Sequence, residues 1–588
     1  MKKSIIYGLL AIAATSLTGC NDFLNDNRWP LDTQSDNPEF WNSEVNVQGQ
    51  INNLYNYFYG YGNGAGRNGT FYFESLSDDQ VGQWGSSVEF NTWAYLITPS
   101  SNSDWNGDYD RLRAANYIIN NVEKNTMAKP TANSFIGEAK IVRAYQLFDL
   151  VRKFGDVPLV LTVLDPSDPE LYMGRTPRNE VIDQAVADLD FAIQNITTVA
   201  NKGTFSQDLA RAMKVEVCLF EASYAKYHAN DKARSDKYFN EVIKTAGELM
   251  KSTYTLCDDY ASLYNSTDGV VNGIPSLRSN PEVIFMKAYK DGVFCHSLVK
   301  YTNTGEILGM SRDAFESYLF LDGKPMSQQA DKLDKGEMPV IGKDDDGKPV
   351  YGQLNIKKCL EARDKRLSAT IDTVVFYENY GWARPVNGTS MTSKSGYGVK
   401  KFYNDKFSLY NATTDNQSLT CAPLYWLAEI YLAYAEAKAE LGTITDTDLN
   451  LTINKLFKRA GLPEQTVAGL SAINDPKAAE MGVSSLIYEI RRCRRCELMF
   501  DKGLRYWDLV RWHKLDLLDN VKHPNVTLGA YAQPAIDKGH FVKNSNGYVN
   551  VFEGLTRVFT DREYLYPIGT NELTTNPALG NNNPGWEK

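Results

Sequence analysis

The sequence predicts a mainly α-helical protein in which tetratricopeptide-like helical hairpins pack against a loop-rich region with small β-sheets. Apolar residues recur at helical spacing over two long blocks, about 40–250 and about 420–515. Between these blocks, over about 252–420, Gly, Asn, Asp and Ser separate short strand-like runs. Paired amphipathic helices rich in Ala and Tyr are typical of tetratricopeptide-like hairpins, although the full repeat signature is not met.

The N-terminus has the pattern of an export signal. A basic start is followed by an apolar run from Ile5 to Leu17, shorter than the roughly 18 residues that cross a bilayer. The run ends in LTGC, which resembles a bacterial lipobox, so we expect a signal over residues 1–19 and lipidation of Cys20. Each buried methylene contributes about 0.8 kcal/mol, so several acyl chains would hold the protein to a membrane. The alternative is an ordinary signal peptide with an incidental cysteine.

Ten segments after the signal carry the helical pattern. In the second of them, Leu112, Ala115 and Ile119 fall on one face. In chain order, the expected helices are Asn42–Tyr59, Trp105–Val122, Ser134–Phe154, Pro177–Ile196, Asp208–His228, Ser235–Met250, Pro423–Leu441, Asp448–Arg459, Ser484–Phe500 and Leu504–His513.

The segments between and after the helical blocks are expected to be irregular. Strand-like runs stand out in the central stretch as PEVIFMKAY, TVVFYENY and GYGVKKFYN. The tail, about 516–588, is also rich in loop-forming residues. We therefore expect residues 20–588 to form a single domain, with 252–420 as an insertion between the helical blocks.

Composition narrows the partners. The 588 residues carry a net charge of −10 and have a pI near 5.3, which argues against nucleic acid as the main partner. The chain contains 35 Tyr, 25 Phe and 10 Trp. These rings fill cores, and they also suit a surface that stacks on flat ligand faces.

No metal or cofactor site is indicated by the sequence. Cys493 and Cys496 form a CxxC in an Arg-rich helix, but a zinc site would need a second pair or nearby histidines. We expect a structural pair there, and leave its oxidation state open. The acidic run Lys343–Gly347 lacks the later ligands of an EF-hand, so we expect a solvated turn rather than a calcium site.

Several segments in order resemble markers of the SusD/RagB family of outer-membrane nutrient-binding lipoproteins. Those segments are NDFLNDNRWP, WNGDYDRLRAANYIINNV, EAKIVRAYQLFDLVRKFGDVPLV, FESYLFLDGKP, RDKRL, LYWLAEIYLAYAEAKAELG, KRAGLP, YEIRRCRRCELMFDKGLRYWDLVRW and YLYPIGTNELTTNPALGNNNPGW. Departures are small: Cys493 and Cys496 stand where the family usually has other residues, and Gly569 replaces a common proline.

The resemblance implies a lipid-anchored protein on the outer face of the outer membrane. Such a protein binds an oligosaccharide on its variable, loop-rich face and delivers it to a SusC-like TonB-dependent outer-membrane transporter. Three alternatives stay open: a peptide or glycopeptide ligand within the same family, a structural tetratricopeptide adaptor, and a surface glycosidase. A carboxylate pair for glycoside cleavage is not singled out among the 72 acidic residues.

Catalytic motifs are missing, so we expect no enzyme. The sequence has no HExxH, no GxSxG and no P-loop. Gly64–Gly69 matches GxGxxG, but it lies in a Gly- and Asn-rich loop rather than between a strand and a helix. The arginine cluster of the helix Ser484–Phe500 is expected to be a buried structural network, with Glu497 and Asp508 as partners.

Two predicted loops combine aromatic and polar side chains as a sugar-binding surface requires. Sugar rings present apolar CH faces ringed by hydroxyls, which stack on aromatic rings flanked by polar groups. The first loop supplies Asp78, Gln83, Trp84, Trp93 and Tyr95. The second supplies Tyr377, Tyr380, Trp382 and Arg384. Trp105 begins a helix and is expected in the core instead.

Overall fold

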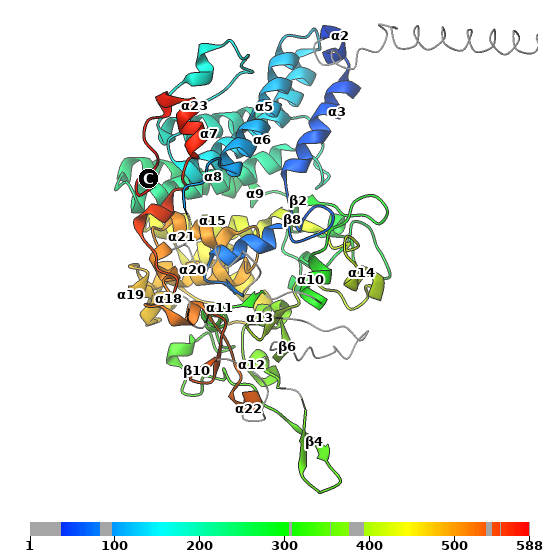
Figure 1. The fold of residues 1–588 in the computed structure, drawn as a ribbon, viewed down its shortest axis with the longest axis vertical. Helices are drawn as coiled ribbons and strands as arrows, with labels where there is room; N and C mark the ends of the chain where they lie inside the picture. The colour runs from blue at the N-terminus through cyan, green and yellow to red at the C-terminus, as the bar shows by residue number, and fades with distance from the viewer. Residues whose placement is uncertain are drawn as a thin grey trace, which may run out of the picture.

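The computed structural model describes residues 37–82, 97–304, 308–352, 354–375, 393–536, 544–552, 554 and 556–586. Within them the fold is mainly α, with four two-stranded sheets and one three-stranded sheet, as the sequence predicts. In Figure 1 the stacked helices occupy the upper part and the loop-rich region lies below them. None of the helices in these ranges is long and apolar enough to cross a membrane.

The upper layer consists of helices in which each packs on the next along the chain, as in tetratricopeptide-like hairpins. Its members are α2 (Pro38–Trp41), α3 (Glu44–Leu54), α5 (Ser103–Glu123), α6 (Lys129–Phe154), α7 (Arg178–Asn195), α8 (Gln207–Tyr227) and α9 (Lys232–Leu249). Side-chain caps start several of these helices: Asn102 accepts from Asp104 N, and Ser206 accepts from Leu209 N. Gly155, at φ 75°, ends α6 ahead of Pro158.

A second set of helices lies beneath this layer. It comprises α15 (Leu427–Glu440), α16 (Asp446–Leu451), α17 (Ile453–Ala460), α18 (Val467–Ser471), α19 (Pro476–Glu480), α20 (Ser485–Glu497) and α21 (Leu504–Arg511). Helix α15 packs on α9 and α8 on one side and on α20 and α17 on the other. Two apolar cores meet at α15, because Ile430 and Ala433 face the upper core while Leu432 and Ala435 face the lower one.

The loop-rich region contains short strands and short helices. The helices are α10 (Leu298–Thr304), α11 (Arg312–Ser317), α12 (Lys357–Glu361), α13 (Lys365–Thr370) and α14 (Leu409–Thr413), with α22 (Gln533–Ile536) and α23 (Thr570–Thr575) in the tail. Four antiparallel pairs are β1 (Gln80–Val81) with β3 (Gly309–Met310), β2 (Val283–Lys287) with β8 (Ala422–Trp426), β4 (Val340–Lys343) with β5 (Pro349–Tyr351), and β6 (Ile371–Val375) with β7 (Tyr397–Val399). The three-stranded sheet has the order β10 (Asn544–Ser545), β11 (Tyr548–Asn550), β9 (Leu528–Tyr531).

The predicted helix Pro423–Leu441 was wrong in its first turn. Residues Ala422–Trp426 form β8, and the helix begins only at Leu427. Strand β8 is buried at every position and pairs with β2, so its backbone groups are satisfied by a partner far away in sequence. The predicted helix Asp448–Arg459 is also divided, because Thr452 leaves helical geometry at φ −131°, ψ −91°.

Other helix ends differ less. The predicted Asn42–Tyr59 is α3 followed by a 3₁₀ turn at Tyr55–Tyr57, and the predicted start at Ser134 lies within α6, which begins at Lys129. Trp105 is buried, as expected.

The arginine cluster is a buried structural network, which confirms its predicted character. Arg494 binds Asp508 at 2.8 Å, the pairing expected from sequence. Glu497 was expected to pair within the same helix, and this was wrong: it accepts from Arg366 at 2.8 Å and from Arg459. Cys493 and Cys496 lie in the same buried region and their thiols are free.

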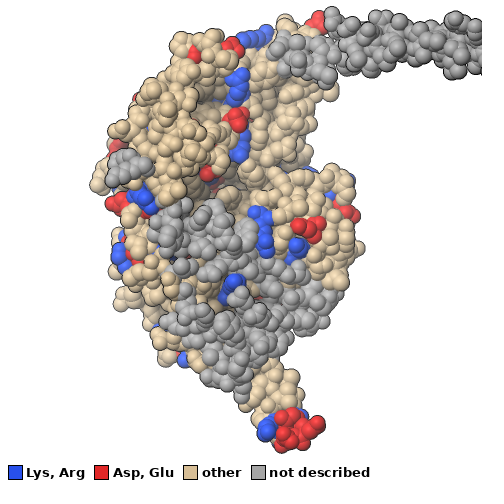
Figure 2. Space-filling view, viewed as in Figure 1, with Lys and Arg blue, Asp and Glu red and all other residues tan. Residues whose placement is uncertain are grey.

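The β4–β5 hairpin projects from the lower end of the molecule in Figure 1. Figure 2 shows charged side chains gathered at its tip, where Asp344–Asp346 are exposed. The Asp344 carbonyl accepts from Gly347 N and the Asp344 carboxylate from Lys348 N, so the run expected to be a solvated turn is one.

Candidate functional site

One of the nine predicted ligand contacts, Asp78, lies among the described residues. The predicted lipidation site Cys20 is outside them. So are the remaining predicted contacts, Gln83, Trp84, Trp93, Tyr95, Tyr377, Tyr380, Trp382 and Arg384. The structure describes the chain on either side of the two predicted loops.

Asp78 belongs to the core rather than to a ligand surface. Its two carboxylate oxygens accept from Arg505, each at 2.7 Å, and Arg495 lies 3.2 Å away. Burial raises the pKa of Asp78, but the guanidinium groups of Arg495 and Arg505 outweigh burial and hold it below its ordinary value. Asp78 is 2% exposed and both of its oxygens accept from guanidinium groups, so we do not include it among the proposed ligand contacts.

The neighbouring Asp79 extends this network. Arg495 donates to Asp79 at 2.6 Å and also binds Asp313 of α11 at 2.7 Å. Burial, together with the charge of Asp78, raises the pKa of Asp79 to about 6 against the opposing field of Arg495. The ion pairs of Asp78 and Asp79 hold the chain in place just before the first aromatic-rich segment, 83–96.

Strand β1 directly follows Asp79 and pairs with β3 at the edge of the loop-rich region. Gln80 pairs with Met310 and Val81 with Gly309, and Ser311 N donates to the Asp79 carbonyl at 2.9 Å. The first aromatic-rich segment therefore begins directly beside β3.

The second aromatic-rich segment, 376–392, starts and ends at the same place. Val375 and Tyr397 are paired across β6 and β7. A Cβ built on Gly309 would lie 1.9 Å from Ser393 Oγ and 2.3 Å from Ser395 Oγ, so β3 touches the chain just after this segment. Two segments some 300 residues apart in sequence are thus attached to one edge.

Aromatic packing makes this edge rigid. Tyr397 stacks on Phe315 of α11 with ring centroids 4.8 Å apart and an interplanar angle of 4°. The guanidinium of Arg363 lies 4.6 Å from the centre of the Phe315 ring. The first contact holds β7 against α11, and the second packs Arg363 on the same Phe315 ring.

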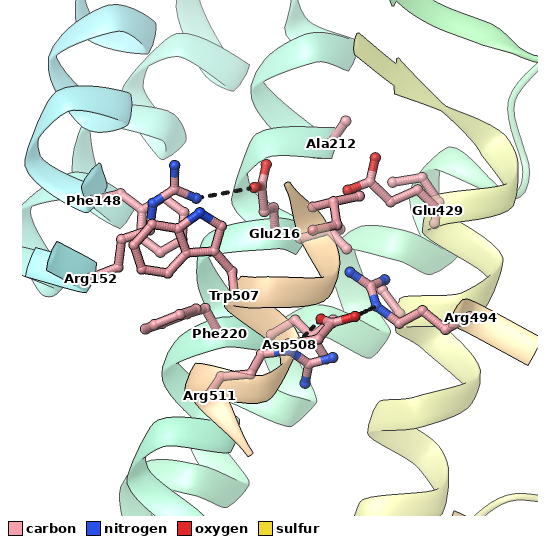
Figure 3. Close-up of a pocket in the computed structure, with 15 residues that line it drawn as sticks. Phe148, Arg152, Ala212, Glu216, Phe220, Glu429, Arg494, Trp507, Asp508 and Arg511 are labelled. Atoms are coloured by element: carbon pink, nitrogen blue, oxygen red, sulfur yellow. Dashed lines mark hydrogen bonds and ion pairs between the residues drawn. The ribbon is translucent and has the colours of Figure 1, made fainter. Parts of the chain in front are cut away.

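The buried cavity of Figure 3 is too small to be a ligand site. Arg152 of α6, Glu216 of α8 and Trp507 of α21 line it, and Asp508 lies between Arg494 and Arg511. Its volume is about 20 Å³. That is room for about one water molecule, so the cavity belongs to the internal polar network.

A larger pocket of about 330 Å³ opens in the upper layer, between α5, the segment 158–173 and α23. Asp78, the one predicted contact among the described residues, does not line it. Among the residues that the structure describes, no group of three or more His, Cys, Asp or Glu side chains is arranged to hold a metal ion.

Comparison with known sequence families gives two matches. The family described as "SusD family" matches residues 283–586, which is more than half of the chain. The family described as "Starch-binding associating with outer membrane" matches residues 30–215.

Individual relatives are distant. SusD-like protein P2 of Formosa agariphila is 24% identical over 494 residues, covering 82% of this chain and 80% of that protein. SusD-like protein P38 of the same organism is 24% identical over 213 residues, and the match spans 42% of its length. A SusD-like protein of Bacteroides ovatus is 23% identical over 264 residues, spanning 46% of its length.

Solved structures share the fold. A SusD-like carbohydrate-binding protein of Bacteroides fragilis superposes with a TM-score of 0.68 at 21% identity, covering 92% of this chain and 99% of that one. A laminarin-binding SusD-like protein superposes with a TM-score of 0.55 at 20% identity, with the same coverage.

Proposed function

Because the chain belongs to the SusD family, we propose that it captures oligosaccharides at the cell surface and delivers them to a SusC-like TonB-dependent outer-membrane transporter. In this proposal the protein is a binding protein and not an enzyme. Acylation of Cys20 anchors it to the outer membrane, facing the exterior. The family description "associating with outer membrane" supports that location.

One observation carries the proposed site: the first aromatic-rich segment begins, and the second both begins and ends, at the edge formed by β1, β3 and β7. Because both segments start from the same edge, their side chains can contact the same ligand. The proposed contacts are Gln83, Trp84, Trp93, Tyr95, Tyr377, Tyr380, Trp382 and Arg384. Their rings would stack on sugar faces, and Gln83 and Arg384 would bind hydroxyls.

The names of structural neighbours support a glycan as the ligand. One neighbour is named a carbohydrate-binding protein and another a laminarin-binding protein. Within the proposal, the loop-rich face holds the glycan while the helical layer serves as scaffold.

The test is isothermal titration of the purified mature protein, in a detergent without a sugar headgroup, against plant, host and microbial oligosaccharides. We expect micromolar to millimolar binding of one glycan class, lost in Trp84→Ala and in Trp382→Ala. Tyr410→Ala is the matched control, because Tyr410 is 58% exposed on α14, outside both segments. Binding that survives both tryptophan variants would refute the site, and binding of peptides alone would refute the ligand class.

A further inference from the structure

The pocket of about 330 Å³ in the upper layer is lined by a different set of residues from those at the edge of the proposed glycan site. It is formed by α5, by the segment 158–173 and by α23 with the residues that follow it, and no residue of β1, β3, β6 or β7 lines it. Ligand pockets are typically roughly 300–1,000 Å³, so its size suits one small ring rather than a long chain.

Hydrogen bonds between distant segments hold the walls of this pocket in place. Tyr109 Oη donates to the Pro158 carbonyl at 2.9 Å, and Arg113 Nη1 donates to the Leu164 carbonyl at 2.7 Å. On the opposite wall, Asn576 Nδ2 donates to the Met173 carbonyl at 3.0 Å. A pocket that is formed before a ligand arrives loses little free energy to ordering when the ligand binds.

The rim presents large apolar side chains to solvent. Leu171 is 41% exposed and Tyr172 is 54% exposed, and both line the pocket. Trp105 and Tyr109 line it from α5, where Trp105 is buried. An apolar floor below an exposed aromatic rim is the arrangement on which the CH face of a sugar ring can stack.

Polar side chains complete the lining. Asp110 and Glu170 bring carboxylates that accept from hydroxyls, and Arg113 brings a guanidinium that donates to them. Glu572 is already engaged, since its Oε1 accepts from Ser101 Oγ at 2.7 Å and from Asn106 Nδ2 at 2.9 Å. Because the carboxylates of Asp110 and Glu170 outnumber the one guanidinium in the lining, an anionic ligand would be repelled, whereas a neutral ring would not.

We propose that this pocket is a second ligand site that holds a single neutral sugar ring. It goes beyond the proposed capture of oligosaccharides, because the described residues that line it belong to neither aromatic-rich segment. A monosaccharide or the terminal unit of a glycan would stack on Tyr172 and place its hydroxyls against Asp110, Arg113 and Glu170.

The test uses the mature protein labelled with ¹³C at its methionine methyl groups. Met173 lines the pocket and reports on it directly, while Met213, buried in α8, is an internal reference. Neutral monosaccharides are added one at a time. We expect one of them to shift the Met173 signal in a saturable manner and leave the Met213 signal unchanged.

Variants separate this site from the proposed glycan site. Tyr172→Ala and Arg113→Ala alter exposed side chains, and we expect each to weaken the sugar-dependent shift about 3- to 10-fold. Trp84→Ala, Trp382→Ala and the control Tyr410→Ala are expected to leave it unchanged. The proposal is overturned if no sugar shifts Met173 at concentrations that would saturate millimolar affinity. It is equally overturned if Tyr172→Ala leaves the shift intact.

Discussion

Gly309 occupies a position where a single added carbon would change the structure. Any other side chain there would start within 3.0 Å of Ser393 Oγ, Ser395 Oγ and the Tyr397 carbonyl. Close approach of two backbones is a role that only glycine fills. This residue lets β3 touch the chain just after the second aromatic-rich segment, and so it determines that the two segments share an edge.

Gly309→Ala should therefore destabilise the fold and weaken glycan binding together. Overpacking of this kind costs about 1–3 kcal/mol, which urea denaturation would measure as a fall in the free energy of unfolding. Gly342→Ala is the control, because a Cβ at Gly342 meets nothing within 4 Å. Equal stability of the two variants would contradict the close contact described at β3.

Asp78 shows that local sequence does not reveal whether a carboxylate is buried in an ion pair with a distant residue. Its neighbourhood, SDDQVGQW, has the composition of a polar binding loop. Its partner Arg505 is 427 residues away along the chain, and nothing local indicates that pairing. The signal that could have found it was the arginine cluster itself, which needs more buried carboxylates than its own helix supplies.

At the scale of elements, α15 carries a buried carboxylate that ties it to α21. Glu436 accepts two hydrogen bonds from Arg511, at 2.6 and 2.7 Å, and a third from Trp512 Nε1 at 2.8 Å. Burial raises the pKa of Glu436, but the charge of Arg511 and its hydrogen bonds outweigh burial and lower the pKa to about 2.

This lowered pKa predicts a particular acid sensitivity. Because the folded-state pKa is below the ordinary value, the stabilisation is complete above about pH 4.5 and is lost as the pH falls through about 2. The contribution is about 3 kcal/mol. Unfolding free energies measured between pH 6 and 2 should fall less steeply for Glu436→Gln than for the unmodified chain.

Glu123→Gln, an exposed position at the end of α5, serves as the control and should follow the unmodified chain. If Glu436→Gln shows the same slope as this control, the pairing with Arg511 does not stabilise the fold in the way described.

Elements with strong apolar periodicity were predictable, and elements fixed by distant partners were not. Helices α7, α8 and α9 lie close to their predicted ranges because each buries one face within a continuous layer. The apolar run at Ala422–Trp426 suits a strand or a buried helix equally, and pairing with β2 decides between them.

Over the whole molecule, the two apolar cores share α15, whose faces contribute to both. We therefore expect the upper layer and the loop-rich region to unfold together. Urea transitions followed by tryptophan fluorescence and by far-UV circular dichroism should coincide. Two separated transitions would mean that α15 does not couple the cores.

The proposed glycan site was predictable in composition but not in arrangement. The abundance of Tyr and Trp in the predicted loops can be read from the sequence, and it favours a surface that stacks on sugar rings. The shared edge depends on β1 meeting β3 and β3 meeting the chain before β7, contacts between residues hundreds of positions apart. The pocket beside α23 could not be predicted for the same reason, because residues as distant in sequence as Asp110 and Asn576 line it together.

The seven cysteines of the described chain have free thiols, all of them buried, and they are divided between the two cores. Cys218 lies in the upper core, and Cys493 and Cys496 lie in the lower one, where burial raises the pKa of each of these two thiols to about 12. An alkylating reagent reacts with the thiolate, so it can reach these sulfurs only when the surrounding structure opens. The alkylation rate of each cysteine therefore reports how often the core around it opens to solvent. Cys218 reports on the upper core, and Cys493 and Cys496 report on the lower one.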